Sequence, residues 1–525
     1  MKRYIGIISL WACLFFMCAC YEDKGHYDIV DYNEITSLNI NNTLSKTSVV
    51  LGDTVYIFPE LKWKYTDRDT TQNAFEYRWE YEGSVVSTER NLKFVPGKFG
   101  TTTVYLFVTE KETGVVSRLV TSIVTSSAYK TGYLILSAKN EKTSLTFIRR
   151  DQYTEDGKTK YEYVVYEDLY AKAFPGDELG TGPLDVSILP TEWAAADVVL
   201  TQQNGGCWYL NGNDFSKRFE ISANFIGGEY PEEGFEPVAT RYAGFCDFVL
   251  GRNGDVYSKQ KQNAYMTPYN YLFASAPLCT GISQVFDVKV CEMTSNTDFG
   301  YMYDGKNHRF LACMAGTSMY ANSLTGRIFP ITNNFDPATF VDINDMRGYK
   351  LIYCGQFNGP NFMNILKNEA TGEYLYQTYG LQNMFSSLTL IDAKQEVFAG
   401  SQYITDNTIF LRSRTLPYLY FGEGTKLYFY DSSTKKTKLY ADFSLDPDFK
   451  GGQISSIGQS PGCEEIGVGF DNGDLYICDA KTTAILAADD PSKEGILEKV
   501  SNLGRIVQVG WKWGGYVAYW FDRDM

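Results

Sequence analysis

Between residues 36 and 125, the pattern of apolar and polar positions consists of six short segments. Segments such as Glu76–Tyr81 and Thr102–Thr109 place apolar or aromatic residues at every second position, and turn residues such as Pro96-Gly97 separate them. A period of two is typical of a β-strand that has one face in a core. The pattern therefore predicts a small β-sandwich, with Trp79 as the buried residue at its centre.

Residues 128–525 show no long amphipathic helical pattern and repeat a strand–turn–strand cadence instead. Two hairpins nearly repeat, because Arg252–Tyr257 and Asp471–Tyr476 both carry Asn-Gly-Asp followed by an aliphatic residue and a tyrosine. Asn-Gly is a strong signal for a tight β-hairpin. Propellers repeat about every 40–50 residues, so roughly 400 residues predict a β-propeller of seven or eight blades. Two sandwich domains in tandem are the alternative.

The end of the chain carries an aromatic strand pattern at Tyr516–Phe521. Pairing of this strand with Tyr133–Leu136 would build one blade from both ends of the propeller sequence. Such a pairing hides the sheet edges that an open ring exposes. The predicted fold is therefore all-β, with a β-sandwich at residues 36–127 and a β-propeller at residues 128–525.

The N-terminus has the composition of a signal sequence. Lys2 and Arg3 form a positive region ahead of Ile5–Met17, an apolar stretch that is too short to span a bilayer. The pattern predicts a cleaved signal peptide at residues 1–19. The alternatives to a lipoprotein signal are an uncleaved anchor and a type I signal.

The apolar stretch ends in Met17-Cys18-Ala19-Cys20, which resembles a bacterial lipobox. This resemblance implies that Cys20 is lipidated and becomes the first residue of the mature protein, although Met stands where Leu is usual. Three acyl chains would anchor the protein stably. Residues 20–35 would then form a tether, and its acidic start at Tyr21–Lys24 resembles the surface-export signal of Bacteroidota lipoproteins. A solvated linker also explains these four residues.

Further features carry a family resemblance. They are the motifs Cys20–Asp28, Asn33–Ile35, Gly52–Val55, Tyr77–Trp79 and the strand Val104–Thr109 after Gly100. Together they resemble the PKD-like family of Bacteroidota surface lipoproteins, over about the first quarter of the chain. The resemblance implies an immunoglobulin-like sandwich, an outer-membrane location facing the cell exterior, and a SusC/SusD-type nutrient importer as partner.

The charge and the histidine content of the chain argue against nucleic-acid binding, zinc binding and catalysis that depends on histidine. The chain has 63 acidic and 48 basic residues, and loss of residues 1–19 with Lys2 and Arg3 changes the net charge from −15 to −17. Such an acidic chain is unsuited to nucleic acid, which requires a basic face. Two histidines, His26 and His308, provide no cluster for zinc and little material for Ser-His or Cys-His catalysis.

The short motifs that resemble catalytic or metal sites fail on chemistry. Gly458–Gly462 matches the nucleophile elbow, but Pro461 has no N–H for an oxyanion hole and no histidine follows His308. Asp471–Asp474 suggests calcium, yet its glycine is misplaced and Thr482 stands at the twelfth position, where an EF-hand has Glu. We predict turns at both places, and we expect no cofactor and no metal.

The cysteines are candidate core residues, and the tryptophans are candidate ligand-binding residues. Eight cysteines follow Cys20 without any CxxC spacing, and we expect most of them to be buried apolar residues. Aromatic platforms bind sugars and peptide side chains. The candidate platforms in the propeller are Trp193, Trp208, Trp511 and Trp513.

The sequence as a whole favours binding over catalysis. We expect an outer-membrane lipoprotein, accessory to a SusC/SusD-type importer, that binds or presents a glycan or a peptide. One alternative is a propeller glycoside hydrolase or lyase that uses carboxylates. The other is a structural subunit that docks onto the importer and contacts no nutrient.

Overall fold

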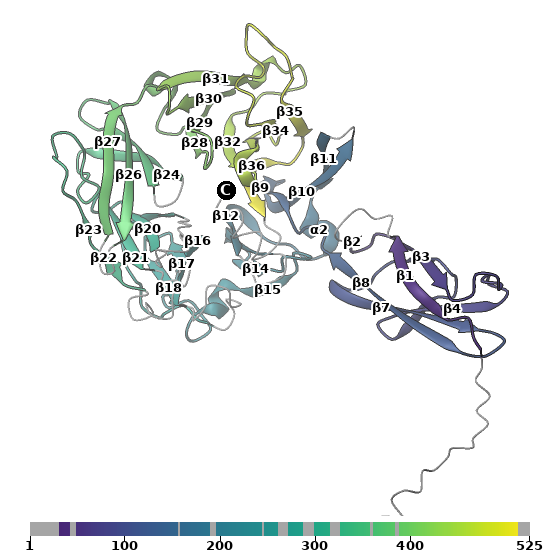
Figure 1. Ribbon diagram of the computed structural model, residues 1–525. Helices are drawn as coiled ribbons and strands as arrows, with labels where there is room; N and C mark the ends of the chain where they lie inside the picture. Colours follow the sequence, from purple (N-terminus) through teal and green to yellow (C-terminus); the bar gives the residue numbers. More distant parts are fainter. Residues whose placement is uncertain are drawn as a thin grey trace, which may run out of the picture. The chain divides into compact units, whose positions relative to one another are not determined.

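The chain forms β-structure almost throughout its described parts (Figure 1). Two compact units divide it: one ends at Ser126, and the other begins at Ser127. Within the described ranges, no helix is long and apolar enough to cross a membrane. The computed structural model describes residues 31–41, 49–155, 158–189, 196–243, 246–260, 271–286, 299–314, 326–357, 361–383 and 388–512.

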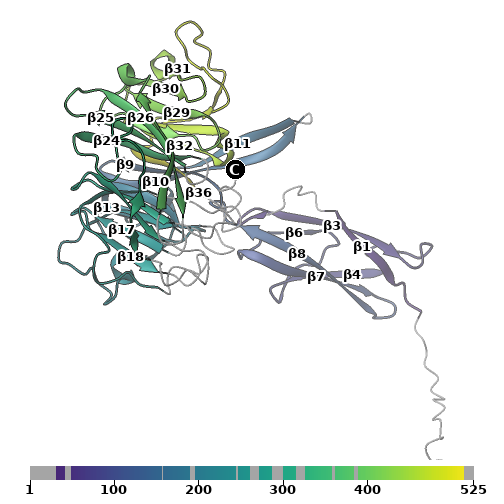
Figure 2. The ribbon, with the colours of Figure 1, turned by 60° about the vertical axis from the view of Figure 1, so that its left-hand side comes forward.

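The first unit is a sandwich of two β-sheets around one core (Figure 2). Trp79 is fully buried there, and its indole Nε1 donates to the main-chain oxygen of Glu89 at 3.0 Å. This confirms the predicted central role of Trp79. One sheet has the order β1 (Ile35–Asn41), β3 (Val55–Trp63), β6 (Leu92–Phe94). The other has the order β2 (Val49–Val50), β8 (Val116–Ser126), β7 (Gly100–Glu110), β4 (Phe75–Tyr81), β5 (Ser84–Ser87).

The second unit is a β-propeller (Figure 1). Its described strands form seven blades if one eight-stranded sheet, whose halves pair only at Lys142 and Thr181, is counted as two. Blade 1 contains β36 (Arg505–Lys512), β9 (Gly132–Lys139), β10 (Lys142–Glu155) and β11 (Lys158–Tyr166). Blade 2 contains β12 (Thr181–Leu189), β13 (Asp197–Asn204), β14 (Trp208–Leu210) and β15 (Lys217–Glu220). Blade 3 contains β16 (Pro237–Ala243), β17 (Cys246–Gly251) and β18 (Val256–Gln260), and blade 4 contains β19 (Ile282–Phe286), β20 (Phe299–Asp304), β21 (Arg309–Met314) and β22 (Ile328–Phe329).

The remaining blades continue the same antiparallel meander. Blade 5 contains β24 (Tyr349–Phe357), β25 (Asn361–Asn368), β26 (Tyr374–Asn383) and β27 (Leu388–Val397), with β23 (Ile331–Thr332) parallel to β27. Blade 6 contains β28 (Ile409–Arg412), β29 (Tyr418–Glu423), β30 (Lys426–Asp431) and β31 (Lys436–Asp442). Blade 7 contains β32 (Ile454–Gln459), β33 (Glu465–Phe470), β34 (Leu475–Asp479) and β35 (Ile496–Val500). The short helices are α2 (Leu169–Ala173), η1 (Ile221–Asn224), η3 (Ser401–Tyr403), η4 (Phe443–Leu445) and η5 (Pro461–Cys463).

Strand β36 closes the ring by pairing antiparallel with Gly132–Ala138 of β9. This confirms the prediction that the ring closes at Tyr133–Leu136. The prediction of Tyr516–Phe521 as the closing strand was wrong, because β10 and β36 occupy both edges of β9. Tyr516–Phe521 itself lies outside the described residues. Alternation alone does not say which of two successive strand patterns will take an open sheet edge.

Glycines let blade 7 approach the closing strand closely. A Cβ atom on Gly458 would lie 2.5 Å from the main-chain oxygen of Val509, and one on Gly469 would lie 2.7 Å from Cγ2 of Ile506. Both distances are far shorter than ordinary contacts between such atoms. A larger residue at either position would therefore push blade 7 away from β36.

A buried carboxylate connects blade 7 to blade 1. Oε1 of Glu465 receives hydrogen bonds from Nη1 of Arg150 at 3.0 Å and from the hydroxyl of Tyr163 at 2.7 Å. The hydroxyl of Tyr133 lies 3.4 Å from Oε2. Burial and the neighbouring carboxylate raise the pKa of Tyr163, so this hydroxyl remains a donor. The Glu465 side chain is only 2% exposed, so its charge depends on these donors.

We expect Glu465→Gln to lower the free energy of unfolding of the propeller by about 3–5 kcal/mol, because it leaves the Arg150 cation without its carboxylate partner. The matched control is Glu464→Gln, whose side chain is 41% exposed and faces Lys481 at 3.4 Å. The control should change stability by less than about 1 kcal/mol. Urea unfolding followed by tryptophan fluorescence measures both, and equal midpoints for the two variants would contradict the assigned role of Glu465.

Lys512, the last residue of β36, is fully buried. Its Nζ donates to the main-chain oxygen of Tyr129 at 2.7 Å. Burial lowers the pKa of Lys512 to about 7; the carboxylate of Asp197 opposes this shift, and Lys130 reinforces it. The ammonium group of an unfolded chain has a pKa near 10.4. Between about pH 7 and pH 10 the unfolded state therefore binds more protons than the folded state.

This difference predicts that Lys512 makes stability rise with pH between about pH 7 and pH 10, by up to about 1.4 kcal/mol per pH unit. We expect Lys512→Met to be more stable than the wild type at pH 6, where the buried charge costs most, and to lose this advantage by pH 10. The exposed Lys436→Met is the control and should follow the wild type at every pH. Urea midpoints measured across this range test the prediction, which fails if the wild type and Lys512→Met differ by a constant amount.

Candidate functional site

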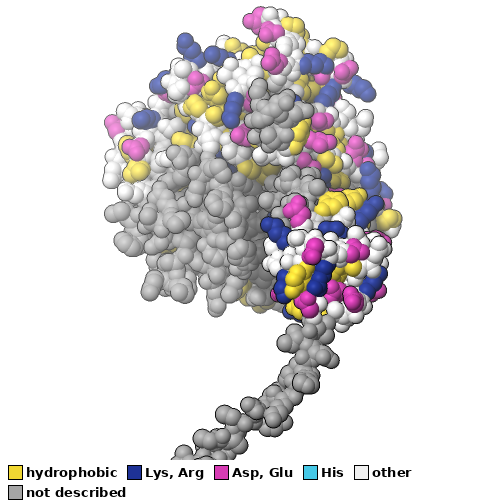
Figure 3. Space-filling view, turned by 45° about the vertical axis from the view of Figure 1, so that its right-hand side comes forward, with side chains coloured by type: hydrophobic (Ala, Val, Ile, Leu, Met, Phe, Trp, Pro, Cys, Tyr) yellow, Lys and Arg dark blue, Asp and Glu magenta, His cyan; other side chains and the backbone are white. Residues whose placement is uncertain are grey.

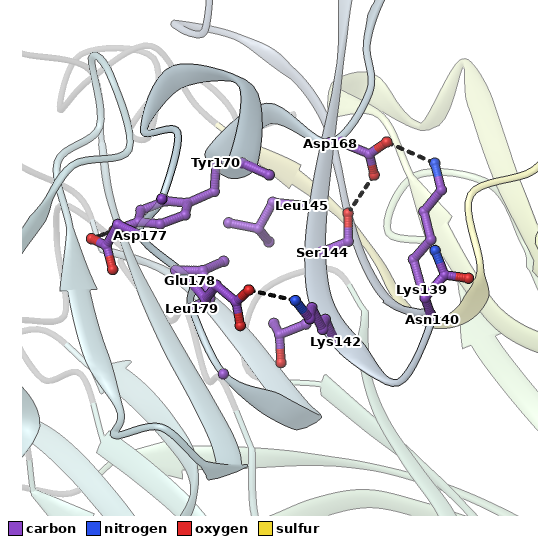
Figure 4. Close-up of a pocket in the computed structure, with 14 residues that line it drawn as sticks. Lys139, Asn140, Lys142, Ser144, Leu145, Asp168, Tyr170, Asp177, Glu178 and Leu179 are labelled. Atoms are coloured by element: carbon purple, nitrogen blue, oxygen red, sulfur yellow. Dashed lines mark hydrogen bonds and ion pairs between the residues drawn. The ribbon is translucent and has the colours of Figure 1, made fainter.

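A first cavity of about 400 Å³ lies beside blades 1 and 2, where the β9–β10 turn, α2 and the segment before β12 meet (Figure 4). Asp168 stands on one side of it. Its carboxylate receives hydrogen bonds from Nζ of Lys139 at 2.8 Å and from Oγ of Ser144 at 3.1 Å. Burial works against the charged form, but these two donors lower the pKa of Asp168 overall. The carboxylate is thus ionised and already satisfied.

The other charges around the first cavity are also paired with one another. Lys142 forms an ion pair with Glu178 (Figure 4). Asp177 accepts a hydrogen bond from the hydroxyl of Tyr170 at 2.5 Å and another from Nζ of Lys217 at 2.8 Å. A ligand would have to replace these contacts rather than add to them. We therefore attribute the polar groups of the first cavity chiefly to the packing of blades 1 and 2.

A second cavity of about 620 Å³ lies between blades 5 and 6. Its walls come from β24–β27 of blade 5, from the end of β28, and from the β30–β31 turn of blade 6. Aromatic rings, amides, hydroxyls and both signs of charge are present together. The lining residues are Phe357, Asn361, Tyr376, Thr378, Tyr379, Asp392, Lys394, Gln395, Glu396, Arg412, Ser432 and Lys435.

Arg412 is the most unusual residue of the second cavity, because it is a charged side chain that is only 7% exposed. Its Nη1 lies 2.8, 2.6 and 2.8 Å from the main-chain oxygens of Ser413, Leu416 and Tyr418. Its guanidinium carbon lies 4.7 Å from the ring centroid of Phe357. Among the described residues, its Nε has no hydrogen-bond acceptor. Burial disfavours the charged form and lowers the pKa of Arg412.

Buried amides hold the floor of the second cavity in place. Nε2 of Gln377 donates to Oε1 of Gln395 and to the main-chain oxygen of Val341, both at 2.9 Å. Nδ2 of Asn364 donates to Oε1 of Gln377 at 3.2 Å, and the hydroxyl of Tyr379 donates to Oδ1 of Asn364 at 3.3 Å. Because satisfied polar networks of this kind are rigid, Gln395 and Tyr379 are presented in fixed positions.

Charged residues of β27 and blade 6 complete the lining. Glu396 accepts a hydrogen bond from the hydroxyl of Tyr430 at 3.0 Å and forms an ion pair with Lys435. Lys394 and Asp392 are exposed on the same strand. Since Lys435 already neutralises Glu396, the remaining charges are those of Arg412, Lys394 and Asp392.

Of the four tryptophans proposed from the sequence as binding platforms, the two that the structure describes lie in different blades. Trp193 and Trp513 lie outside the described residues. Trp208 is half-buried on β14 in blade 2, and its indole N–H is used in a main-chain hydrogen bond. Trp511 is buried on β36 in blade 1, where its ring meets that of Tyr133 edge-on at 4.8 Å. Trp511 therefore contributes to the core, and binding by the other tryptophans stays a prediction.

Both motif-like turns are turns in the structure. Gly458–Gly462 ends strand β32 and leads through η5 into β33, so Ser460 is followed by a three-residue 3-10 turn and a strand rather than by the α-helix that an elbow requires. Asp471–Asp474 is the tight turn between β33 and β34, with Gly473 at a φ of +91° that favours glycine. The turn at Asn253-Gly254 joins β17 to β18 in the same way.

The described cysteines are free thiols, and all but Cys279 are buried, which confirms the expectation that most are apolar core residues. Cys20 and Cys291 lie outside the described residues. No group of three or more His, Cys, Asp or Glu side chains in the described ranges is arranged to hold a metal ion. Acidic and basic side chains are interspersed over the described surface in Figure 3.

Sequence reasoning missed Arg412. It stands in Phe-Leu-Arg-Ser-Arg, a stretch with no motif and with a second arginine two residues on. Its significance comes from burial between two blades and from the carbonyl groups of the β28–β29 loop. Neither property has a signal in the local sequence.

Three solved propeller-like structures are similar to the chain at low identity. A quinonprotein alcohol dehydrogenase-like protein of Bacteroides thetaiotaomicron is 14% identical, with 91% of this chain and 96% of that chain covered and a TM-score of 0.28. A structural genomics protein of the same organism is 10% identical, with 85% and 96% covered and a TM-score of 0.28. Chaetomium thermophilum Sqt1, solved with the N-terminus of ribosomal protein L10, is 11% identical, with 62% and 77% covered and a TM-score of 0.36.

No curated protein matches the chain. A family model does match: it is described as the PKD-like family, and it covers residues 20–183. The matched segment contains the described sandwich and continues through β9, β10 and β11 of blade 1 to the start of β12. The chain thus carries a PKD-like family segment, followed by the rest of a seven-bladed β-propeller.

Proposed function

We propose that this chain is a lipid-anchored protein of the outer cell surface and a non-catalytic accessory of a SusC/SusD-type importer. Its propeller binds or presents a glycan or a peptide. The match to the PKD-like family supports this proposal, and the matched segment begins at Cys20, the cysteine expected to carry the lipid.

The second cavity is the observation that carries the proposed binding role. Its volume of about 620 Å³ falls within the range of roughly 300–1,000 Å³ of small-molecule sites, which combine apolar walls with a few fixed polar groups. Phe357 and Tyr376 supply aromatic surface. Gln395 and Arg412 supply polar groups that hydrogen bonds already hold in place. A preformed site of this kind loses little entropy when it binds.

The carboxylates of the second cavity favour binding over glycoside hydrolysis. A glycosidase needs an acid and a second carboxylate facing each other across the bond, at separations of roughly 5–9.5 Å. Here Asp392 and Glu396 both come from β27, and Glu396 is engaged by Tyr430 and Lys435. The hydrolase alternative therefore has less support at this site than a binding role.

Lipidation is tested by Cys20→Ala in a Bacteroidota host that is fed an alkyne-labelled fatty acid. We expect this variant to lose the label and to leave the membrane fraction, because the thiol that accepts the lipid is gone. Cys18→Ala is the matched control; it places a residue usual at that position of a lipobox and should keep the label. Exposure to added protease on intact cells then tests surface location. A labelled, membrane-bound Cys20→Ala protein would show that Cys20 is not the anchor.

Binding and partnership are tested together on the purified mature protein and on detergent-solubilised membranes. We expect the mature protein to bind members of a glycan or peptide array without altering them, and the anchored protein to co-purify with a SusC/SusD-type pair. Cleavage of an array member would instead support the hydrolase or lyase alternative. Co-purification without binding of any array member would support the purely structural subunit.

A further inference from the structure

Arg412 differs from Arg150 and Lys259, two other largely buried cations of the propeller, in the partners it has. Arg150 faces Glu465 at 3.0 Å, and the fully buried Lys259 and Asp247 face each other at 3.3 Å. Arg412 has no carboxylate partner in the part of the chain that the structure describes. A buried cation without a counter-charge is costly, and groups of this kind call for an explanation in a native structure.

The geometry at Arg412 suits an incoming anion. Contacts to three main-chain carbonyls engage Nη1 and fix the guanidinium plane, and Phe357 packs against that plane. Nε is itself buried and has no acceptor among the described residues, on a side chain that lines the second cavity. The guanidinium fork matches a carboxylate in two parallel hydrogen bonds, and such charge-assisted bonds are among the strongest in proteins.

The surroundings add one further cation, the exposed carboxylate of Asp392, and several neutral donors and acceptors. Lys394 lies on the cavity lining, while Lys435 is already paired with Glu396. Hydroxyl and amide groups of Thr378, Gln395 and Ser432 line the same space. A ligand with one carboxylate and many hydroxyls would match this lining. One way in which an extended peptide binds is by adding a strand to an open sheet edge, and here side chains rather than a strand edge line the cavity.

We propose that the second cavity binds an acidic oligosaccharide, with the carboxylate of a uronic acid residue on Arg412. This inference rests on the proposed nutrient-binding function and names its ligand class. The saccharide hydroxyls contact the side-chain amides and hydroxyls of the walls, and a ring face lies against the half-buried Phe357. Lys394 attracts the anion to the mouth of the cavity.

The test is calorimetric titration of the purified mature protein with trigalacturonate and with trimannuronate. Methyl-esterified trigalacturonate is the uncharged control ligand, and triglutamate is the acidic-peptide control. We expect at least one of the two uronate trimers to bind and its methyl ester to bind at least tenfold more weakly. The inference is overturned if neither acid binds, if the ester binds as tightly as the acid, or if triglutamate binds more tightly than both uronates.

Variants then place the ligand at Arg412. Arg412→Gln should weaken uronate binding at least tenfold, while the exposed Arg414→Gln, two residues away, should leave it unchanged. Because Arg412 also holds the β28–β29 loop, the melting temperature of Arg412→Gln is measured alongside. Lys394→Glu changes an exposed side chain and should weaken uronate binding without affecting folding. Uronate binding that survives both Arg412→Gln and Lys394→Glu overturns the inference.

These results separate this inference from the proposed function. Neutral glycans that bind the wild type and Arg412→Gln equally would overturn the uronate site and leave nutrient binding intact. Arg412-dependent uronate binding by a protein that never associates with an importer would overturn the accessory role and leave the uronate site intact.

Discussion

The pairing of β36 with β9 is the interaction on which the rest of the propeller depends. Each blade contacts its two neighbours, so a ring in which the first and last blades did not join would expose a sheet edge and an apolar blade face. By supplying the innermost strand of blade 1, β36 removes both. The fixed separation of neighbouring blades, and hence both cavities between them, follows from this closure. Gly458, Gly469 and the buried Glu465 lie at this seam because blade 7 must pack tightly against the closing strand.

Charge pairing distinguishes structural from ligand-binding polar groups in this ring. The first cavity contains as much charge as the second, but its cations and carboxylates satisfy one another. In the second cavity, the protein immobilises a guanidinium against three main-chain carbonyls and provides no carboxylate for it among the described residues. A buried cation without a counter-charge lowers the stability of the fold, and a bound anion would offset this cost. Arg412, rather than cavity size, is therefore our reason for proposing the binding site at the border of blades 5 and 6.

The family match and the two structural units divide the chain differently. The units divide between Ser126 and Ser127, whereas the PKD-like match continues to residue 183. The matched segment thus includes β9, β10 and β11 but not β36, their partner strand in blade 1. These three strands depend on the far end of the chain for the inner edge of their blade. The family segment accordingly contains three of the four strands of blade 1, and the fourth strand, β36, comes from outside the segment.

Local chemistry made part of this protein predictable. Alternation along β4, the buried Trp79 and the Asn-Gly turns after Phe470 and Arg252 are decided within a few residues, so the sequence alone indicates a sandwich and a ring of hairpins. It also disqualifies Ser460 as a nucleophile, because Pro461 has no N–H whatever the fold. The tertiary structure alone decided the properties that need distant segments together. These are which strand closes the ring, the burial of Trp511, and the position of Arg412 between two blades with no carboxylate partner among the described residues. Burial and charge pairing depend on neighbours far apart in the chain, and a local pattern does not contain those neighbours.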